Sequence, residues 1–290
     1  MSAALLPNRR VEAWKYSDLR AALAEQSFAI AGEGEVIEQL AQGAGRREGV
    51  SVPAGGERVQ IEHLEAHGLY PVAEEVRLAA GARYHRVVLQ TGAGVPLSFC
   101  RVHLAEGAQF RQFVLAEGGR LARIETQVEV EGEGAEVELN GVYLAGAGRH
   151  ADLTSRITHH VPNGKTSQLI KGAARAKGRG VFQGKILVAR GAQKTDARQG
   201  HHALLLEEGA EVYAKPELEI YADDVACAHG NTAGALSADQ LFYLRARGIP
   251  EAQARALLVE AFLGEAVSEW LPEAARADVL ARIRAWLEAG

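Results

Sequence analysis

Cysteine, proline and aromatic residues are scarce in this sequence, and their scarcity narrows the possible classes of protein. Only two cysteines, Cys100 and Cys227, occur among 290 residues. Two cysteines do not make a disulfide framework, which excludes the small disulfide-stapled scaffolds. Aromatic residues make up 6% of the chain, so aliphatic side chains and alanine must form most of the core. Eight prolines stand beside 32 glycines, which indicates an ordered chain with many tight turns.

Long apolar runs and a strong excess of charge are also missing. No segment approaches the roughly 20 apolar residues that a membrane helix needs, so we predict no membrane insertion. The net charge is -5 with a pI of about 6.1, whereas nucleic-acid binders usually carry a basic excess. The first residues lack the charge-then-apolar order of a secretory signal. We therefore expect a cytoplasmic globular protein with reduced thiols and no nucleic-acid partner.

Residues 1–75 are predicted to form an N-terminal helical segment followed by a connector. Up to about residue 45, apolar residues fall near helical spacing: Val11, Trp14, Leu19 and Leu23. The connector, from residue 46 to 75, contains a single short alternating stretch at residues 59–64.

Residues 76–233 change character and predict a β-rich core. Short segments of period-two alternation, typical of half-buried strands, recur without a convincing helix between them. They are Tyr84–Leu89, Phe99–Leu104, Gln109–Leu115, Arg123–Val130, Ala135–Leu139, Gly184–Val188 and Glu217–Tyr221.

Small residues punctuate this core at a regular interval. Three pairs, Gly81-Ala82, Gly107-Ala108 and Gly134-Ala135, recur every 26 or 27 residues. A fixed period in this range favours a repeat architecture, and strands without helices favour a β-helix. A β-sandwich with irregular hairpins is the alternative, because the hairpin signals Asn140-Gly141 and Asn163-Gly164 are also present.

Residues 234–290 are predicted to be helical. Ser237 is expected to cap a helix, with Gln240 three residues later, and Pro250 and Pro272 are expected to open two more. The last helix carries an apolar stripe consisting of Val279, Leu280, Ile283, Trp286 and Leu287. Such a face either covers the end of the β-helix or docks a partner.

Several motif-like stretches do not meet the requirements of the chemistry they suggest. Gly164-Lys165-Thr166-Ser167 resembles the end of a Walker A loop, but His159 occupies the position of its first glycine, so we predict no ATP site. His63 and His67 lack the adjacent glutamate of a zinc-protease motif. The adjacent pairs His159-His160 and His201-His202 would point to opposite faces of a strand, so neither pair can chelate one ion alone.

Cys227 and His229 form the pair with the clearest potential for metal chemistry. Two residues apart on a strand, they would share one face. A thiolate and an imidazole suit iron or zinc, but two ligands leave a site incomplete. The missing ligands would have to come from elsewhere in the fold, from a substrate or from another subunit. A buried cysteine beside a hydrogen-bonded histidine is the alternative.

The same region resembles the SufB/SufD family of iron–sulfur cluster assembly proteins. The N-terminal stretch and the ending Cys227-Ala228-His229-Gly230 are similar to the SufD branch of that family. The chain is short for this branch, and we expect the shortening in its N-terminal part. The resemblance rests on Glu12–Leu19, Arg179–Ile186, Gln193–Ala197, Pro216–Gly230, Asp239–Pro250 and Ala254–Phe262.

The resemblance implies a non-catalytic scaffold with a β-helix core flanked by helical segments. Such a subunit pairs with a SufB homologue through the β-helix and docks the SufC ATPase through its C-terminal helices. A desulfurase system supplies sulfur indirectly, and a transient iron–sulfur cluster or iron is shared with SufB. His229 matches a proposed interface ligand, and Cys227 is its neighbour. Reduced flavin is associated with such complexes, although this sequence shows no flavin-binding motif.

Two other functions fit parts of the sequence. A β-helix enzyme acting on a polysaccharide or an acyl donor would need carboxylates or a histidine along a groove. A SufB-like subunit would accept sulfur on Cys227 or Cys100. The isolated chain could also form a homodimer, because β-helices leave strand edges exposed.

Overall fold

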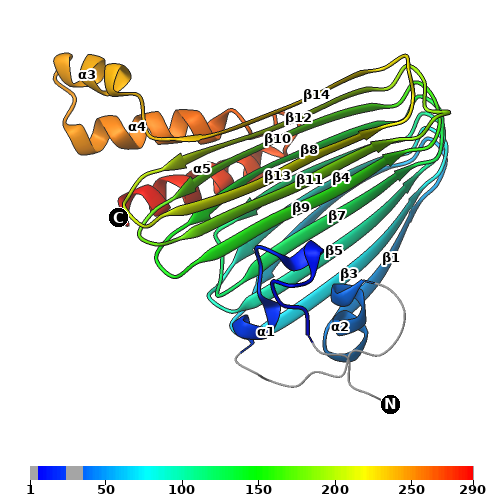
Figure 1. The fold of residues 1–290 in the computed structure, drawn as a ribbon, viewed down its shortest axis with the longest axis horizontal. Helices are drawn as coiled ribbons and strands as arrows, with labels where there is room; N and C mark the ends of the chain where they lie inside the picture. Colours follow the sequence, from blue (N-terminus) through cyan, green and yellow to red (C-terminus); the bar gives the residue numbers. More distant parts are fainter. Residues whose placement is uncertain (1–5, 24–34, 290) are drawn as a thin grey trace.

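The computed structural model describes residues 6–23 and 35–289 and shows a β-solenoid with helices at both ends of the chain (Figure 1). The solenoid covers residues 46–234 and consists of two seven-stranded sheets. Sheet A contains β1 (Arg46–Val52), β3 (Leu69–Leu78), β5 (Val95–Leu104), β7 (Ala122–Val130), β9 (His150–His159), β11 (Arg179–Val188) and β13 (Glu211–Ile220). Sheet B contains β2 (Glu57–Glu65), β4 (Arg83–Thr91), β6 (Gln109–Ala116), β8 (Glu136–Ala145), β10 (Lys165–Ala174), β12 (Asp196–Leu205) and β14 (Ala226–Gly234).

Every ladder between these strands is parallel, because successive strands alternate between the two sheets. Arg83 of β4 pairs with Gln109 of β6, 26 residues later, and Lys165 of β10 pairs with Asp196 of β12, 31 residues later. One coil of the solenoid therefore takes about the interval that the Gly-Ala pairs predicted. The β-helix prediction is confirmed, and the hairpin-built sandwich is excluded, since hairpins pair strands antiparallel.

The regular glycines mark one corner of the solenoid. Gly81, Gly107 and Gly134 lie two residues before β4, β6 and β8, with φ of 65°, 61° and 70°. This left-handed conformation strains residues that carry a side chain. Asn163 and Lys194 adopt it at the same corner of later coils, with φ of 62° and 63°. The glycine period fades there although the corner persists.

The interior of the early coils holds an ion-pair network as well as aliphatic side chains. Arg86 is fully buried and donates to Glu74 at 2.8 Å, to Glu62 at 2.9 Å and to Gln112 at 2.9 Å. The carboxylates compensate the buried guanidinium, which would otherwise be costly to desolvate. The network fixes the register of the first coils.

The strand region begins earlier than expected. The stretch predicted as a connector, residues 46–75, forms β1, β2 and most of β3. Its N-terminal neighbour is only partly described, as η1 (Glu12–Trp14), α1 (Leu19–Ala22) and α2 (Val36–Ala44). Part of the helical prediction for residues 1–45 falls on residues 1–5 and 24–34, outside the described residues.

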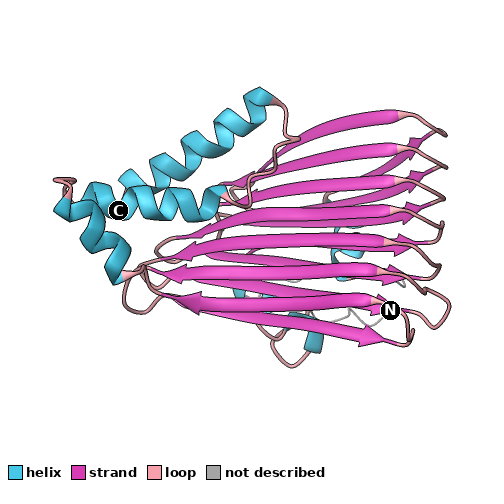
Figure 2. Cartoon of the chain, turned by 90° about the horizontal axis from the view of Figure 1, so that it is seen from above, coloured by secondary structure: helices cyan, strands magenta, loops and turns pink. Residues whose placement is uncertain are grey.

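The C-terminal helices are α3 (Ala238–Ala246), α4 (Glu251–Gly264) and α5 (Glu273–Glu288). Ser237 caps α3 as predicted, and Pro250 and Pro272 stand at the N-caps of α4 and α5. In Figure 2 these helices gather on one side of the stacked strands. No helix of the described chain is long and apolar enough to cross a membrane.

The helices α4 and α5 cover the outer face of sheet B. Of the two alternatives that the sequence left open for their apolar faces, the first, covering the end of the β-helix, is wrong. Trp270 donates to Glu138 of β8 at 2.7 Å, and Arg282 of α5 pairs with Glu117 at 3.0 Å. The shared apolar cluster joins Val87, Leu89, Phe113, Leu115 and Val142 to Val259, Leu263, Val279 and Ile283.

Candidate functional site

Cys227 and His229 lie on β14, the last strand of the solenoid and one edge of sheet B. In the described chain β14 pairs only with β12, so its other edge is free (Figure 1). Cys227 stands beside Ala197 and His229 beside Gln199 in this ladder. The predicted pair is therefore on a strand, two residues apart, at the open end of the solenoid.

Both side chains share the face of β14 that continues the solenoid interior. Cys227 is half-buried and packs against the apolar cluster that contains Val188 and Ala197. His229 is exposed, and its ladder partner Gln199 is buried and donates to Gln168 at 3.1 Å. The predicted pair is therefore neither fully buried among apolar side chains nor distant from the exposed edge of the sheet.

The environment of Cys227 holds its thiol in the protonated form. Burial raises the pKa of the Cys227 thiol above its ordinary value, and the negative charge of Asp196 raises it further. A hydrogen bond from the Ala197 backbone opposes both effects. A bound cation would supply the missing driving force for deprotonation, since a coordinating thiol loses its proton to the metal.

Within residues 6–23 and 35–289, the pair does not form a complete metal site. Among the described residues, no group of three or more His, Cys, Asp or Glu side chains lies close enough to hold an ion. Of the nearby carboxylates, Asp224 pairs with Lys194 and Asp223 is exposed.

The second cysteine is unsuited to sulfur transfer. Cys100 is fully buried in the interior, 3.9 Å from Glu74. Burial raises the pKa of its thiol to about 12, and the Glu74 and Glu62 charges act in the same direction against the opposing effect of Arg86. The thiolate is the nucleophile in sulfur chemistry, so Cys100 is inert as the fold presents it.

The other candidate motifs take structural or surface positions. Gly164 and Lys165 lead directly into β10, a strand, whereas a Walker A lysine begins a helix. His67 is exposed, and its imidazole lies 3.6 Å from Glu65. His159 is buried and His160 is exposed. His201 is buried and His202 is half-buried, so the two members of each pair point to opposite faces.

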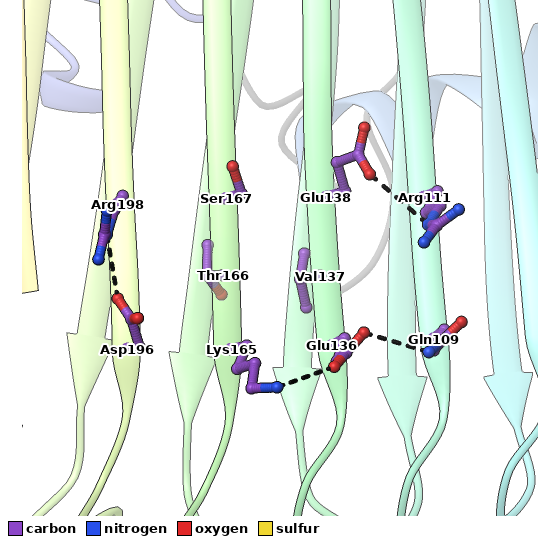
Figure 3. Close-up of a pocket in the computed structure, with 10 residues that line it drawn as sticks. All are labelled: Gln109, Arg111, Glu136, Val137, Glu138, Lys165, Thr166, Ser167, Asp196 and Arg198. Atoms are coloured by element: carbon purple, nitrogen blue, oxygen red, sulfur yellow. Dashed lines mark hydrogen bonds and ion pairs between the residues drawn. The ribbon is translucent and has the colours of Figure 1, made fainter. Parts of the chain in front are cut away.

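A groove of about 310 Å³ lies over the starts of β6, β8, β10 and β12 (Figure 3). A hydrolase or lyase would need a free carboxylate or histidine there. Each of the three carboxylates in the groove instead faces a cation: Glu136 with Lys165, Glu138 with Arg111, and Asp196 with Arg198. The groove gives the enzyme hypothesis no support.

The two ends of the solenoid differ in charge. The strand β14 reads Ala-Cys-Ala-His-Gly-Asn-Thr-Ala-Gly and carries no Asp, Glu, Lys or Arg. The opposite edges, β1 and β2, carry the exposed residues Arg47, Glu48, Glu57, Arg58 and Glu65. At the same end as β14, the last strand of sheet A, β13, also carries charges, namely Glu211, Lys215, Glu217 and Glu219. Charges protect strand edges from pairing, so among the four edge strands of the described chain β14 alone lacks this protection.

A second exposed surface follows β14 directly. The helix α3 begins four residues after β14 ends and buries none of its residues against the described chain. Phe242 is 73% exposed, Tyr243 56% and Leu257 of α4 43%. Figure 1 shows this helical arm, α3 with the start of α4, projecting beyond the strands. Large exposed side chains clustered in this way mark interaction surfaces.

Sequence reasoning missed the support beneath β14. His201 and His202 of β12 each hydrogen-bond to a side chain of β14, although the sequence suggested only structural or surface roles. The signal in the sequence was the two-residue period of a strand, which places the adjacent residues His201 and His202 on opposite faces of β12.

Comparisons with known proteins identify the family of this chain. The family described as "SUF system FeS cluster assembly, SufBD core domain" matches residues 40–262. Iron-sulfur cluster assembly protein SufD of Escherichia coli is 33% identical over 252 residues, which cover 84% of this chain and 59% of that protein.

Two further relatives are SufBD family proteins. The one from Synechocystis is 34% identical over 200 residues, 68% of this chain and 44% of its own length. The one from Mycobacterium leprae is 33% identical over 238 residues, 79% of this chain and 61% of its own length. The chain therefore spans about half to three fifths of the curated relatives it matches. It belongs to the SufBD family of SUF-system iron–sulfur cluster assembly proteins and is SufD-like.

Proposed function

We propose that this chain is a non-catalytic scaffold subunit of a SUF complex that takes part in iron acquisition and in holding a nascent cluster at an interface with a SufB homologue. One observation carries the proposal. Cys227 and His229 lie two residues apart on β14. This strand carries no charged side chain, and its outer edge has no neighbouring strand in the described chain. Half a ligand set at a pairing edge calls for a partner that supplies the other half.

The ligand pair suits iron or an iron–sulfur cluster as cargo. Thiolate and imidazole bind such soft or borderline metals. The exposed imidazole of His229 can meet the metal first, and the half-buried Cys227 thiol then loses its proton to bind. The apolar surroundings of Cys227 would limit water around the bound metal.

The β14 edge supports pairing with the SufB homologue. Its backbone groups on the free side need hydrogen-bond partners when they are removed from water. A partner strand would satisfy them and bring its own ligands next to Cys227 and His229. In the isolated chain, a second copy could occupy the same edge as a homodimer.

The helical arm supports docking of the SufC ATPase, and the desulfurase system would reach the complex through the other subunits. ATP hydrolysis would take place on SufC, and closure of two SufC subunits would strain the arms and open the interface to iron. Phe242 and Tyr243 offer aromatic anchors of the kind that dominate interfaces. A cytoplasmic location is part of the proposal, since both cysteines are free thiols.

The test is cluster assembly by the whole complex. The chain is co-expressed with its SufB and SufC homologues, and iron and acid-labile sulfide are measured per purified complex. His229→Ala and Cys227→Ala should lower both contents severalfold without loss of subunits. His67→Ala, an exposed histidine at the other end of the solenoid, is the matched control. Unchanged contents in His229→Ala would refute the ligand role.

A further inference from the structure

Two side chains of β12 grip β14 from opposite faces. The Nδ1 atom of His201 lies 2.7 Å from Oδ1 of Asn231, and Nδ1 of His202 lies 2.8 Å from Oγ1 of Thr232. Both are in-register neighbours in the β12–β14 ladder. We infer that these two hydrogen bonds, here called the β14 clasp, position His229 and Cys227 for metal binding; the inference rests on the function proposed above.

The inner half of the clasp is built into the core. Because the Asn231 oxygen can only accept, the proton of His201 sits on Nδ1, and Nε2 is left to accept from the Tyr143 hydroxyl at 3.1 Å. The ring of His201 also stacks on Phe182, with centroids 4.9 Å apart and planes 7° apart. His201 therefore has a fixed tautomer and a fixed orientation.

Two glycines on neighbouring strands make room for this support. A Cβ atom on Gly172 of β10 would lie 1.8 Å from the Tyr143 ring, and one on Gly180 of β11 would lie 2.2 Å from it. The Tyr143 ring occupies the space that these missing side chains leave. Groups of β8, β10, β11 and β12 that contact one another therefore hold His201, which makes the interior hydrogen bond to Asn231.

The position of the clasp allows it to act on Cys227 and His229 rather than on the stability of the whole solenoid. β14 has one neighbouring strand, its residues are small, and it is mostly exposed. The clasp residues Asn231 and Thr232 lie between His229 and the helical arm that begins at Ala238. Any pull on the arm reaches the clasp before it reaches the ligands. With the clasp closed, Cys227 and His229 keep their register against Ala197 and Gln199.

Conservative variants separate the hydrogen bonds from side-chain size. Asn231→Leu and Thr232→Val remove the oxygen atoms that make these hydrogen bonds at nearly constant volume, whereas Asn231→Asp and Thr232→Ser retain an oxygen at each position. Asn231 and Thr232 are exposed, so neither exchange opens a core cavity. The first readout is amide hydrogen exchange of the β14 peptide in the full chain. The second is the thiolate-to-cobalt absorption of Co²⁺ titrated into the complex with the SufB and SufC homologues.

The loss of one hydrogen bond should speed exchange in β14 about fivefold, and the double variant Asn231→Leu/Thr232→Val about thirtyfold. Exchange in the other strands and the Tm of the solenoid should stay unchanged. Co²⁺ binding should weaken by similar factors, and Asn231→Asp and Thr232→Ser should restore both readouts. Unchanged exchange and Co²⁺ binding in the double variant would overturn the clasp while leaving the ligand role intact. Faster exchange, combined with full cluster content in His229→Ala, would instead retain the clasp as a structural contact and overturn the ligand role.

Discussion

The indole ring of Trp14 lies over the guanidinium group of Arg123, with 4.3 Å between the guanidinium carbon and the ring centroid. Arg123 is buried on β7 and donates to Glu125 at 2.8 Å and to Asp152 at 3.0 Å. Ser17 donates to Asp152 as well. The N-terminal stretch that resembles the SufD branch is therefore a docking segment for the outer face of sheet A.

Removal of the Arg123 charge should be costly. Arg123→Met leaves the carboxylates of Asp152 and Glu125 buried without their cation, and we expect a loss of about 3–5 kcal/mol in the free energy of unfolding. Urea unfolding of the full chain measures this. The control is Arg156→Met, an exposed arginine on the neighbouring strand β9, which should change stability by about 0.5 kcal/mol or less. Equal effects of the two substitutions would contradict the buried-network account.

The close approach of Gly172 to Tyr143 predicts a second stability effect. Gly172→Ala forces the buried Tyr143 ring to move, and overpacking of this kind costs about 1–3 kcal/mol. Gly49→Ala on β1 has no atom within 4 Å of the new methyl group and should be neutral or slightly stabilising. Thermal unfolding compares the two variants. Gly172→Ala should also speed amide exchange in β14, because Tyr143 supports His201.

Buried histidines predict a loss of stability in mild acid. Burial lowers the pKa of His150 to about 4, and Arg179, Arg9 and Arg123 act in the same direction against Asp152. The pKa in the unfolded chain is about 6.5, so the unfolded state binds more protons between these values. The contribution to stability is complete above pH 6.5 and falls as the pH drops toward 4.

Urea unfolding at pH 7 and pH 5 measures this effect, which linkage puts at about 2 kcal/mol for His150. His159, whose pKa burial also lowers to about 4, adds to it. His150→Gln should reduce the difference between the two pH values, with the exposed His67→Gln as control. A difference that His150→Gln leaves unchanged would show that His150 protonates without unfolding.

The uncharged β14 edge predicts how pairing can be blocked. Ala228→Lys places a charge on the exposed edge strand next to the ligand pair, and strand edges that carry lysine resist pairing. We expect the SufB homologue to be lost from the purified complex, while the Tm of the isolated chain stays the same. Ile61→Lys on β2 is the control at the opposite edge and should leave the complex intact. Retention of the partner by Ala228→Lys would place the interface elsewhere.

The exposed aromatics of the arm predict where the ATPase binds. Phe242→Ala should weaken SufC binding about 30-fold or more, since a central aromatic anchor contributes about 2 kcal/mol or more. Titration calorimetry with the isolated SufC homologue measures the affinity. Tyr70→Ala, an exposed tyrosine on β3, is the control. A normal affinity in Phe242→Ala would separate the arm from ATPase docking.

The β-helix could be predicted from the sequence where outer positions are polar, as at Arg101 and His103 of β5 and at Glu136 and Glu138 of β8. Strands β10 and β12 were not predicted, because their interior positions carry the polar residues Gln168, Gln199 and His201. Their outward positions near the strand ends are apolar, since helices cover them. The alternation of apolar and polar residues that marks a half-buried strand is then lost. The early strands β1 and β2 are short of apolar residues because they form a charged edge, and they were predicted as a connector for that reason.

The placement of Cys227 and His229 on one face of a strand could be predicted from the sequence because it depends on local geometry. A spacing of two on a strand places Cys227 and His229 on one face in any register. The clasp was not predictable, since it depends on which residue of β12 stands beside Asn231. That register is set by the length of the intervening chain, residues 206–225, which forms β13 and the corners on either side of it.

The contrast between the two ends of the solenoid limits how far such molecules can stack. A strand ladder open at both ends would accept one copy after another and grow into a fibre. If two molecules join through their β14 edges as proposed above, the strands left at the outer ends are β1 and β2, whose charged side chains disfavour further strand pairing. Under the proposed pairing, the charges on β1 and β2 would limit such stacking to two scaffolds.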